Sequence, residues 1–460
     1  MRRLRWKCSA LPVRKWERVW LRSKKNDRLS SQKIVRCNCA AQPVEPVVLP
    51  RTHINPPGHW VTEPKLNYSQ AVRCGELIFT TGQVALDTNL TVIAAADLRG
   101  QIRAAVNDLC GVLDAADTTP ADLVHLRAFY IPTNTLTSDD ITEWIGECLG
   151  FLEVAGPAIT LVPVEMLMSP GVLFEIEGIA MRGQTGQPLD RTAASDPHWY
   201  GLPAPFSHAL RVGQMLFTSG ITARNRAGTV LSPGDLTGQS HVVLQRLDGL
   251  LRQLGGNIRD VVKTNVFNVE PGNAQDWSAP ALARASYYPE PGPAATGISL
   301  RTAEPHDVMI INDVIAMRSE DGQRMARSYV WPENHWDWPV HLPYRHGIRC
   351  GDLVFLGGQV PLNQDTSVAH KGDIAAQTEL SMEYIRRVLH EFGLDFSHVV
   401  RINTFYATGD AGDADESLWK RNLHTRFAHF VPPGPTTTGV PLPYLAYAKM
   451  NIEIDVIAMV

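Results

Sequence analysis

The sequence predicts an α+β protein made of three tandem domains, and two observations lead to this prediction. The first is a residue pattern that occurs three times with a constant offset. Gly75, Gly213 and Gly351 lie 138 residues apart, and so do the glycines at 82, 220 and 358. The second is that strand and helix signals follow in the same order within each copy. Since solenoid repeats are only ~20–50 residues long, each copy is expected to be a small domain.

Each copy is expected to open with a β-hairpin around its glycine, followed by a helix. In the first copy, residues 71–73 and 77–81 are rich in β-favouring side chains on either side of Gly75. From residue 98, apolar side chains recur at helical spacing, and Asp97 stands where an N-cap is needed. The apolar positions of the three predicted helices are Ile102, Val106, Leu109, Val112 and Leu113; Val243, Leu244, Leu247, Leu250 and Leu251; and Met382, Ile385, Val388 and Leu389.

The second half of each copy predicts a strand, a less regular helix and two closing strands. The strands after the first helix are expected at residues 123–130, 261–269 and 399–406, and each second helix contains a tryptophan: Trp144, Trp277 or Trp419. A Gly-Pro pair precedes the penultimate strand, and the last strands are expected at 174–181, 309–317 and 451–459. Each copy is therefore an expected ββαβαββ unit with both helices on one face of its sheet.

Connectors rich in proline and glycine separate the copies and set the predicted domain limits at 55–183, 196–319 and 333–460. Each connector also carries a His-Trp pair before its glycine, namely His59-Trp60, His198-Trp199 and His335-Trp336. These pairs are expected either to close over a binding site as a lid or to pack across the seam between repeats.

Composition indicates a globular protein without an evident nucleic-acid or membrane partner. The chain has 44% hydrophobic and 20% charged residues and a net charge of −4. No apolar run approaches the ~18 residues that span a membrane. Residues 1–50, however, hold 13 Lys or Arg against three acidic residues. This segment is interpreted as a basic N-terminal extension, either disordered, or translated from an upstream start codon, or an organellar leader. A cytoplasmic location is the default prediction.

The cysteines predict neither a metal site nor a disulfide framework. The chain has seven, without a CxxC pair or a Cys/His cluster, which fits a reducing compartment. Cys74 and Cys350 occupy equivalent positions, but the second copy has Val212 there, so they are expected to be core residues. Neither a metal nor a cofactor is expected.

Each copy resembles the Rid (reactive intermediate deaminase, YjgF-type) family over its whole length. The first copy shows the matching features as Tyr68-x-x-Ala71-(x)3-Gly75, Phe79-x-Thr-Gly-Gln and an Asp-Leu-(x)2-Gln helix start at Asp97. The resemblance implies a mixed sheet backed by two helices, similar to the chorismate mutase fold, and three subunits around a threefold axis with clefts between them. Three copies in one chain then imply an intramolecular pseudo-trimer in a monomer, with higher association left open.

The resemblance also implies an activity, with one clear departure in this chain. Typical members hydrolyse enamines or imines such as 2-aminoacrylate; an Arg on the penultimate strand holds the carboxylate and a Glu on the last strand positions water. The Arg position is occupied here by Ile159, Ala295 and Thr437. The Glu position is occupied by Glu175, Ile311 and Glu453. Glu453 and Glu175 are therefore the predicted catalytic residues, with a solvated carboxylate as the alternative, and the carboxylate anchor is expected to be lost or moved.

The other predicted site residues are polar or aromatic groups that would bind a small-molecule substrate. The aromatic and histidine candidates could stack or transfer protons, whereas the arginines are kept in every copy and could replace the missing anchor. For each group the alternative is structural: a hydrogen-bonded histidine, a packed tryptophan or a surface ion pair. The predicted set is Tyr344, Tyr68, Arg349, Arg73, His346, His208, Thr437, Trp336 and His335.

The sequence as a whole predicts a divergent enzyme of this superfamily. It is expected to act on a small imine-, enamine- or carboxylate-bearing metabolite, by Glu-assisted hydrolysis or proton transfer, in a specialised biosynthetic or catabolic step. The alternative is a non-catalytic binding or scaffold protein that has lost the family's Arg-dependent chemistry. A ribonuclease-like activity is disfavoured because residues 51–460 are acidic and lack a basic stripe.

Overall fold

The computed structural model describes residues 49–62, 66–133, 135–150, 152–269, 277–303, 305–408 and 416–460. Val47–Val460 form one structural unit. The predicted basic extension at 1–50 lies outside the described residues except for Leu49 and Pro50. Within the described residues, none of the helices has the length and apolar character needed to cross a bilayer.

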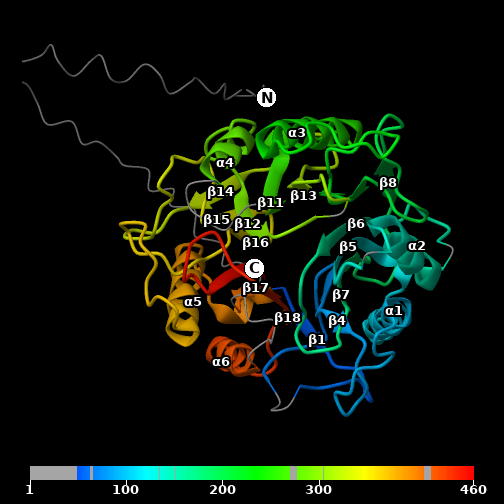
Figure 1. The fold of residues 1–460 in the computed structure, drawn as a ribbon, viewed down its shortest axis with the longest axis horizontal. Coiled ribbons are helices and arrows are strands. Elements are labelled where there is room, and N and C mark those ends of the chain that lie inside the picture. Colours follow the sequence, from blue (N-terminus) through cyan, green and yellow to red (C-terminus); the bar gives the residue numbers. More distant parts are fainter. Residues whose placement is uncertain are drawn as a thin grey trace, which may run out of the picture. The chain divides into compact units, whose positions relative to one another are not determined.

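Three repeats of the same element order make up this unit (Figure 1). The first repeat contains β1 (Arg51–Ile54), β2 (Ala71–Cys74), β3 (Leu77–Thr80), β4 (Gln83–Val84), α1 (Leu98–Ala115), β5 (Leu123–Tyr130), α2 (Ser138–Leu149), β6 (Ala158–Pro163) and β7 (Phe174–Met181). The second contains β8 (Arg191–Ala194), β9 (Ala209–Val212), β10 (Met215–Thr218), α3 (Leu236–Gln253), β11 (Val261–Val269), α4 (Ser278–Ala285), β12 (Ala294–Leu300) and β13 (Ile310–Met317). The third contains β14 (Arg327–Val330), β15 (Gly347–Cys350), β16 (Leu353–Leu356), α5 (Ile374–Glu391), β17 (Val399–Ala407), α6 (Glu416–Phe427), β18 (Thr436–Leu442) and β19 (Ile452–Met459).

Each repeat builds a mixed sheet with one topology. In the described residues the three sheets have the orders β1-β2-β3-β7-β5-β6, β8-β9-β10-β13-β11-β12 and β14-β15-β16-β19-β17-β18, with β4 paired to β7. The pairs β5/β6, β11/β12 and β17/β18 are parallel, and the other pairs are antiparallel. The predicted hairpins, central strands and closing strands are confirmed.

One element of each sheet was missed by the sequence analysis. The edge strands β1, β8 and β14 lie in segments interpreted as connectors, a few residues before the predicted domain starts. They pair in antiparallel register with the first hairpin strand, for example Arg51 with Cys74 and Ile54 with Ala71. A four-residue edge strand that is partly exposed has no regular apolar alternation, so the sequence gives little sign of it.

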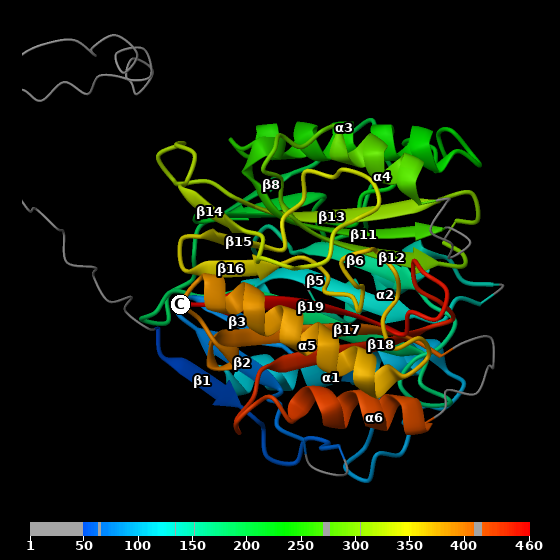
Figure 2. The ribbon, with the colours of Figure 1, turned by 90° about the vertical axis from the view of Figure 1, so that its left-hand side faces the viewer.

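The two helices of each repeat cover one face of its sheet, as predicted. Figure 2 shows α5 and α6 lying side by side against the sheet that contains β17 and β19. In the first repeat, helix α1 buries Ile102, Val106 and Leu109 against the equivalent face of its own sheet. Its N-cap Asp97 accepts a hydrogen bond from the Gly100 amide. Asp235 and Asp373 cap α3 and α5 in the same way.

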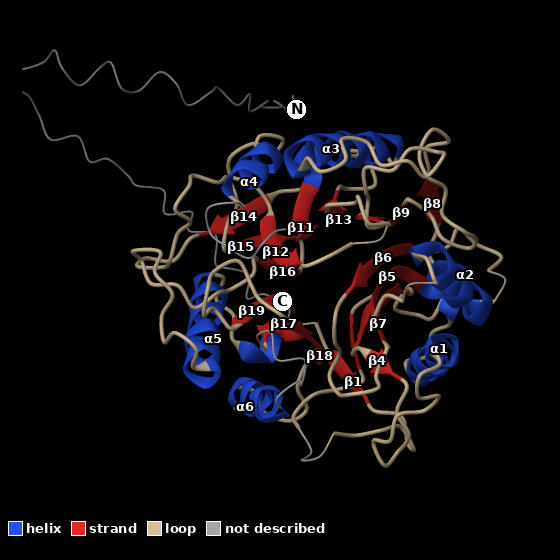
Figure 3. Ribbon diagram, in the orientation of Figure 1, coloured by secondary structure: helices blue, strands red, loops and turns tan. Residues whose placement is uncertain are grey.

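The opposite faces of the three sheets meet in the interior (Figure 3). Phe129, Phe267 and Phe405 are equivalent residues of the three central strands. Their ring centroids lie 6.1–6.4 Å from one another in edge-to-face arrangements. A mutual contact of three equivalent side chains requires the repeats to surround a common pseudo-threefold axis. The predicted intramolecular pseudo-trimer is therefore confirmed.

Candidate active-site clefts

Three clefts lie where the penultimate strand of one repeat meets the first hairpin of another. We name them by the repeats that form them: cleft 1/2, cleft 2/3 and cleft 3/1, with cavity volumes of about 80, 90 and 50 Å³. The same backbone hydrogen bond closes each seam: Gly220 N donates to Ile159 O, Gly358 N to Ala295 O and Gly82 N to Thr437 O, at 3.1, 2.9 and 3.1 Å. The positions at which the sequence lacks an Arg therefore lie directly in the clefts.

The two predicted catalytic glutamates occupy different clefts. Glu175 lies in cleft 3/1 and Glu453 beside cleft 2/3, whereas Ile311 takes this position in cleft 1/2. Both carboxyl groups are buried, at 4% and 3% exposure, so the solvated alternative is wrong. Burial raises the pKa of Glu175 to about 8, with a further increase from the Glu177 carboxylate. Burial also raises the pKa of Glu453 to about 8, against a hydrogen bond from the Gly297 backbone. At neutral pH both are mainly carboxylic acids.

A glycine makes room for each glutamate. A Cβ built on Gly82 would overlap Glu175 Oε1 and lie 2.9 Å from Cδ, and a Cβ on Gly358 would overlap Glu453 Oε1 and lie 2.8 Å from Cδ. Neither glycine has a positive φ, so the constraint at these positions is the space for the carboxyl group and not the backbone conformation.

Gly82→Ala is therefore expected to push the Glu175 carboxyl group out of place and to destabilise the protein by about 1–3 kcal/mol through overpacking. Gly249→Ala is the matched control, because nothing lies within 4 Å of a Cβ at this position in α3. That change should stabilise the protein by about 0.5–1 kcal/mol. Urea unfolding of both variants measures the difference. Equal effects would show that Gly82 does not make space for Glu175.

A buried arginine that the sequence analysis missed enters cleft 3/1. Arg426, from α6, is fully buried and lines this cleft with Glu175, and its Nε and Nη1 have no hydrogen-bond partner. Burial lowers the pKa of Arg426 to about 9, which leaves the guanidinium charged at neutral pH. The Tyr406 hydroxyl is also buried without a partner. Burial raises the pKa of Tyr406, and the nearby Glu175 adds to this increase while Arg426 opposes it. An unpaired buried cation is costly, so this arrangement indicates a site for an anionic group.

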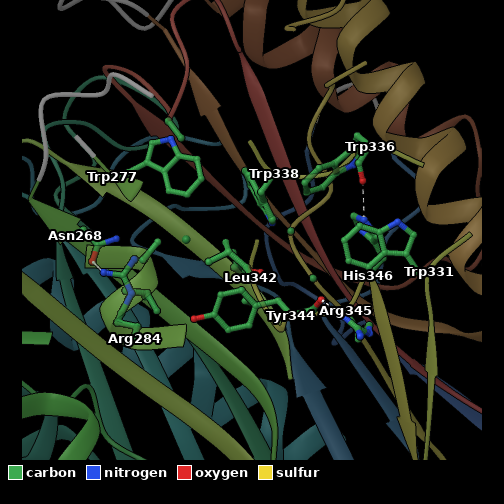
Figure 4. Close-up of a pocket in the computed structure, with 18 residues that line it drawn as sticks. Asn268, Trp277, Arg284, Trp331, Trp336, Trp338, Leu342, Tyr344, Arg345 and His346 are labelled. Atoms are coloured by element: carbon green, nitrogen blue, oxygen red, sulfur yellow. Dashed lines mark hydrogen bonds between the residues drawn. The ribbon is translucent and has the colours of Figure 1, made fainter. Parts of the chain in front are cut away.

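Cleft 2/3 holds the equivalent arginine in a more aromatic setting. Arg284, from α4, lines the cleft, and its Nη1 donates to Asn268 Oδ1 at 3.1 Å. Figure 4 shows the Tyr344 hydroxyl pointing toward Arg284. A sequence signal for both arginines existed: Arg284 follows Trp277 by seven residues and Arg426 follows Trp419 by seven. Seven residues are two helical turns, so each Arg is on the same helix face as its Trp. In the first repeat this position is Phe151, which is not among the described residues.

Cleft 1/2 is built differently. Helix α2 contains no arginine within Ser138–Leu149, and the Glu position is Ile311. Arg224 stacks on the Tyr200 ring, 3.4 Å from its centroid, and its Nη2 lies 3.4 Å from an Asp139 carboxylate oxygen. The predicted His208 lines this cleft and hydrogen-bonds the Tyr200 carbonyl at 2.8 Å. Within the described residues this cleft therefore lacks both the last-strand glutamate and an arginine from the second helix; Arg246 of α3 lines it, but its Nη1 donates to the Thr222 and Arg224 carbonyls.

The predicted His335 and His346 make hydrogen bonds at one wall of cleft 2/3. His335 Nε2 bonds Gln359 Oε1 at 2.8 Å. His346 Nε2 bonds the Trp336 carbonyl at 3.0 Å, the contact drawn in Figure 4. Burial lowers the pKa of His335 to about 4 and that of His346 well below its usual value, so both rings are neutral at pH 7. His59 and Gln83 make the same contact in the first repeat, at 2.9 Å. The His-Trp pairs of repeats 1 and 3 thus fix Trp60 and Trp336 in the cleft walls.

The remaining predicted site residues divide between the clefts and the rim of the sheets. Tyr68 and Thr437 line cleft 3/1, and Tyr344 and Trp336 line cleft 2/3. Arg73 and Arg349 line none of the three clefts. The Arg73 guanidinium bonds the Ala116 and Gly183 carbonyls, and Arg349 Nε bonds the Gly351 carbonyl. The geometry therefore corrects the prediction that these two arginines bind substrate, because their side chains point to turns at the sheet ends.

No grouping of three His, Cys, Asp or Glu side chains suited to a metal ion occurs in the part of the chain that the structure describes. The polar groups that converge in clefts 3/1 and 2/3 are a carboxylic acid, a guanidinium and hydroxyl groups. Together they can bind an anion, donate a proton and hold a water molecule.

Comparison with known proteins shows the family to which this chain belongs. The family model described as Endoribonuclease L-PSP matches residues 61–182, 201–316 and 338–460. Protein DfrA from Myxococcus xanthus is 36% identical over 121 residues, which are 25% of this chain and 85% of that protein. The 3-aminoacrylate deaminase RutC from Acinetobacter baylyi is 27% identical over 114 residues, 24% of this chain and 86% of that protein. The solved structure of protein YJGH is 26% identical, covers 29% of this chain and 96% of its own, and has a TM-score of 0.25. Because the three family matches span most of the sequence, the chain belongs to the Endoribonuclease L-PSP family, also called the Rid or YjgF family, and carries three of its domains in tandem.

Proposed function

We propose that the protein hydrolyses small enamines or imines that carry a carboxylate, with release of ammonia, in clefts 3/1 and 2/3. One observation carries this proposal. Within the described residues, the two clefts that keep the last-strand glutamate are also the two that receive an arginine from the second helix. The third cleft has Ile311, and its helix α2 has no arginine within Ser138–Leu149; the arginines that line it, Arg224 and Arg246, come from other elements. The last-strand glutamate and the second-helix arginine thus occur together in two clefts and are both missing from the described residues of the third, as expected for groups that act on one substrate.

In cleft 3/1 the chemistry divides between Arg426 and Glu175. The Arg426 guanidinium binds the substrate carboxylate through its Nε and Nη1 donors, which have no protein partner. The Glu175 carboxylic acid donates its proton to the β-carbon of the enamine, which gives an iminium ion. The resulting carboxylate then takes a proton from water as the water oxygen bonds to the iminium carbon. Glu175 passes the proton it took from water to the nitrogen. As the carbon–nitrogen bond breaks, the hydroxyl oxygen forms the carbonyl and returns its proton to Glu175, and a keto acid and ammonia leave.

Other features support the same reaction class. The relative from Acinetobacter baylyi is named as a 3-aminoacrylate deaminase, an enzyme of enamine hydrolysis. A cavity of about 50 Å³ suits a substrate of a few non-hydrogen atoms. We include in the proposal that the chain acts as a monomer, because its own three repeats form all three clefts, and that it acts in a cytoplasmic compartment.

Arg426→Met is expected to separate function from stability. Removing the anchor should raise KM for a carboxylate substrate and lower kcat/KM by about 10–100-fold, because one or two charge-assisted hydrogen bonds to the substrate are lost. The same change removes an unpaired buried charge and should raise the free energy of unfolding by roughly 1–3 kcal/mol. Ammonia release from 2-aminoacrylate generated in the assay, and urea unfolding, measure the two effects.

Arg99→Met is the matched control, because Arg99 is exposed and pairs with Glu147 outside the clefts. It should leave KM unchanged and alter stability by less than about 0.5 kcal/mol. An unchanged KM in Arg426→Met would contradict the proposed anchor. Binding of a carboxylate ligand without ammonia release from any enamine would instead favour the non-catalytic binding protein.

A further inference from the structure

Cleft 2/3 differs from cleft 3/1 in the amount of aromatic surface that it presents. Trp277 is the N-cap residue of α4 in the second repeat, and Trp331, Trp336 and Trp338 come from the segment between β14 and β15 of the third repeat (Figure 4). Trp338 stands edge-to-face against both neighbours, with ring centroids 5.4 Å from Trp277 and 4.6 Å from Trp336. In cleft 3/1 the tryptophans among the described lining residues are Trp60 and Trp419.

The larger volume and the aromatic walls together favour a ligand with a flat ring. Cleft 2/3 has a cavity of about 90 Å³ against about 50 Å³ in cleft 3/1. Trp338 is partly exposed, whereas its two neighbours Trp336 and Trp277 are buried, at 1% and 7% exposure. The exposed part of Trp338 is available to a ring, and a stacked or edge-to-face aromatic pair contributes about 0.5–1.5 kcal/mol beyond burial alone.

The charges around the cleft select against a cationic ring. Aromatic walls can also bind cations. Among the described residues that line cleft 2/3, however, the charged side chains are Arg284 and Arg345. Glu453 lies beside the cleft, next to Gly358, and is mainly a neutral carboxylic acid because burial raises its pKa to about 8. Arg345 pairs with the exposed Glu290 at 3.0 Å, whereas Arg284 lies beside Tyr344 and donates to Asn268. A carboxylate on the ligand would therefore meet a guanidinium, and an ammonium would be repelled.

We propose that cleft 2/3 binds an aryl-bearing carboxylate, whose ring packs on Trp338 and whose carboxylate faces Arg284, while cleft 3/1 accepts a smaller carboxylate. Turnover of such a ligand rests on the proposed function, but its binding does not. The chain then has two sites of different specificity within one pseudo-trimer.

Isothermal titration of the full chain with three probes tests the ligand class. Phenylacetate has a ring and a carboxylate, acetate has only the carboxylate, and phenylacetamide has the ring without the charge. Phenylacetate is expected to bind at least about tenfold more tightly than either of the others, since both the ring and the charge contribute. Equal affinity for acetate and phenylacetate would overturn the aromatic site. Equal affinity for phenylacetamide and phenylacetate would overturn the charge assignment.

Variants of single tryptophans identify the cleft. Trp338→Ala should weaken phenylacetate about tenfold and leave acetate unchanged, and Trp338→Phe should recover most of that loss. Trp199→Ala and Trp419→Ala are matched controls, because these residues line clefts 1/2 and 3/1. Loss of phenylacetate binding in Trp419→Ala with none in Trp338→Ala would overturn the proposal. If phenylacetate binds as expected but no enamine yields ammonia, the proposed function fails while this inference stands.

Discussion

Replacing Glu175 and Glu453 together by glutamine is expected to lower kcat for ammonia release by about 10²–10⁴-fold while the fold is kept. Glutamine has the shape of the carboxylic acid that these residues form at neutral pH, so the space beside Gly82 and Gly358 stays filled. It cannot give up a proton, and it cannot accept one from water. The single variants should each remove the part of the activity that belongs to one cleft. Glu147→Gln, at an exposed ion pair, is the isosteric control.

The pH dependence follows from the same two groups. Because their pKa values are raised to about 8, the wild-type rate should be constant near neutral pH and fall as the pH rises through about 8. Between the usual pKa of 4.5 and about 8, the folded state holds protons that the unfolded state has lost. The contribution of these groups to stability is therefore full below pH 4.5 and decreases as the pH rises through this window. The double variant should lack that decrease. Activity that persists in the double variant would exclude both glutamates from catalysis.

Asp455→Ala is expected to destabilise the protein by about 3–5 kcal/mol, since it leaves a lysine charge buried without its partner. Lys263 is 1% exposed, and its Nζ lies 2.7 Å from Asp455 Oδ1, Thr296 Oγ1 and the Leu356 carbonyl. Burial lowers the pKa of Lys263, and Asp455 opposes that shift. These contacts join β11 of the second repeat to β16 and β19 of the third, so the loss should be seen as reduced cooperativity or stability of the whole unit in urea.

Two further variants test whether the buried pair is the cause. Adding Lys263→Met to Asp455→Ala should recover most of the lost stability, because the uncompensated charge is removed. Glu147→Ala, which breaks the exposed pair with Arg99, should cost less than about 0.5 kcal/mol. Light scattering at 50.8 kDa should accompany each unfolding curve, because it shows that the unfolding unit is one chain. Failure of Lys263→Met to rescue Asp455→Ala would assign the loss to packing.

The sequence was sufficient for the fold because the same pattern appears three times in a constant register. A repeated glycine such as Gly75, and repeated apolar positions at helical spacing, report on turns and cores that depend mainly on local sequence. Glu175 and Glu453 could be found because the resemblance assigns their strand position. The edge strand β1 could not be found, because its four residues gain order from pairing with β2 and not from their own pattern.

Arg426 shows why the candidate site was only half predictable. The resemblance assigns the carboxylate anchor to the penultimate strand, where this chain has Thr437, whereas the structure brings Arg426 into the cleft from α6. That juxtaposition depends on how repeat 3 meets repeat 1, across more than 200 residues of chain. Spacing within one repeat can show that an arginine lies on the same helix face as a tryptophan, but it does not show which residues of another repeat that arginine meets. The interval of seven residues between Trp419 and Arg426, shared with Trp277 and Arg284, was the available signal.

The three phenylalanines on the axis are identical, but the residues four positions earlier on the same strands are His125, Lys263 and Arg401. In an oligomer of identical subunits, any substitution at such a position is made three times at once, so a new lysine would bring two more beside it. Fusion of the repeats into one polypeptide removes that constraint, and each position can be changed separately. The repeats are consequently no longer interchangeable: exchanging their order in the gene should place the wrong charge next to Asp455, even though every individual domain would be intact.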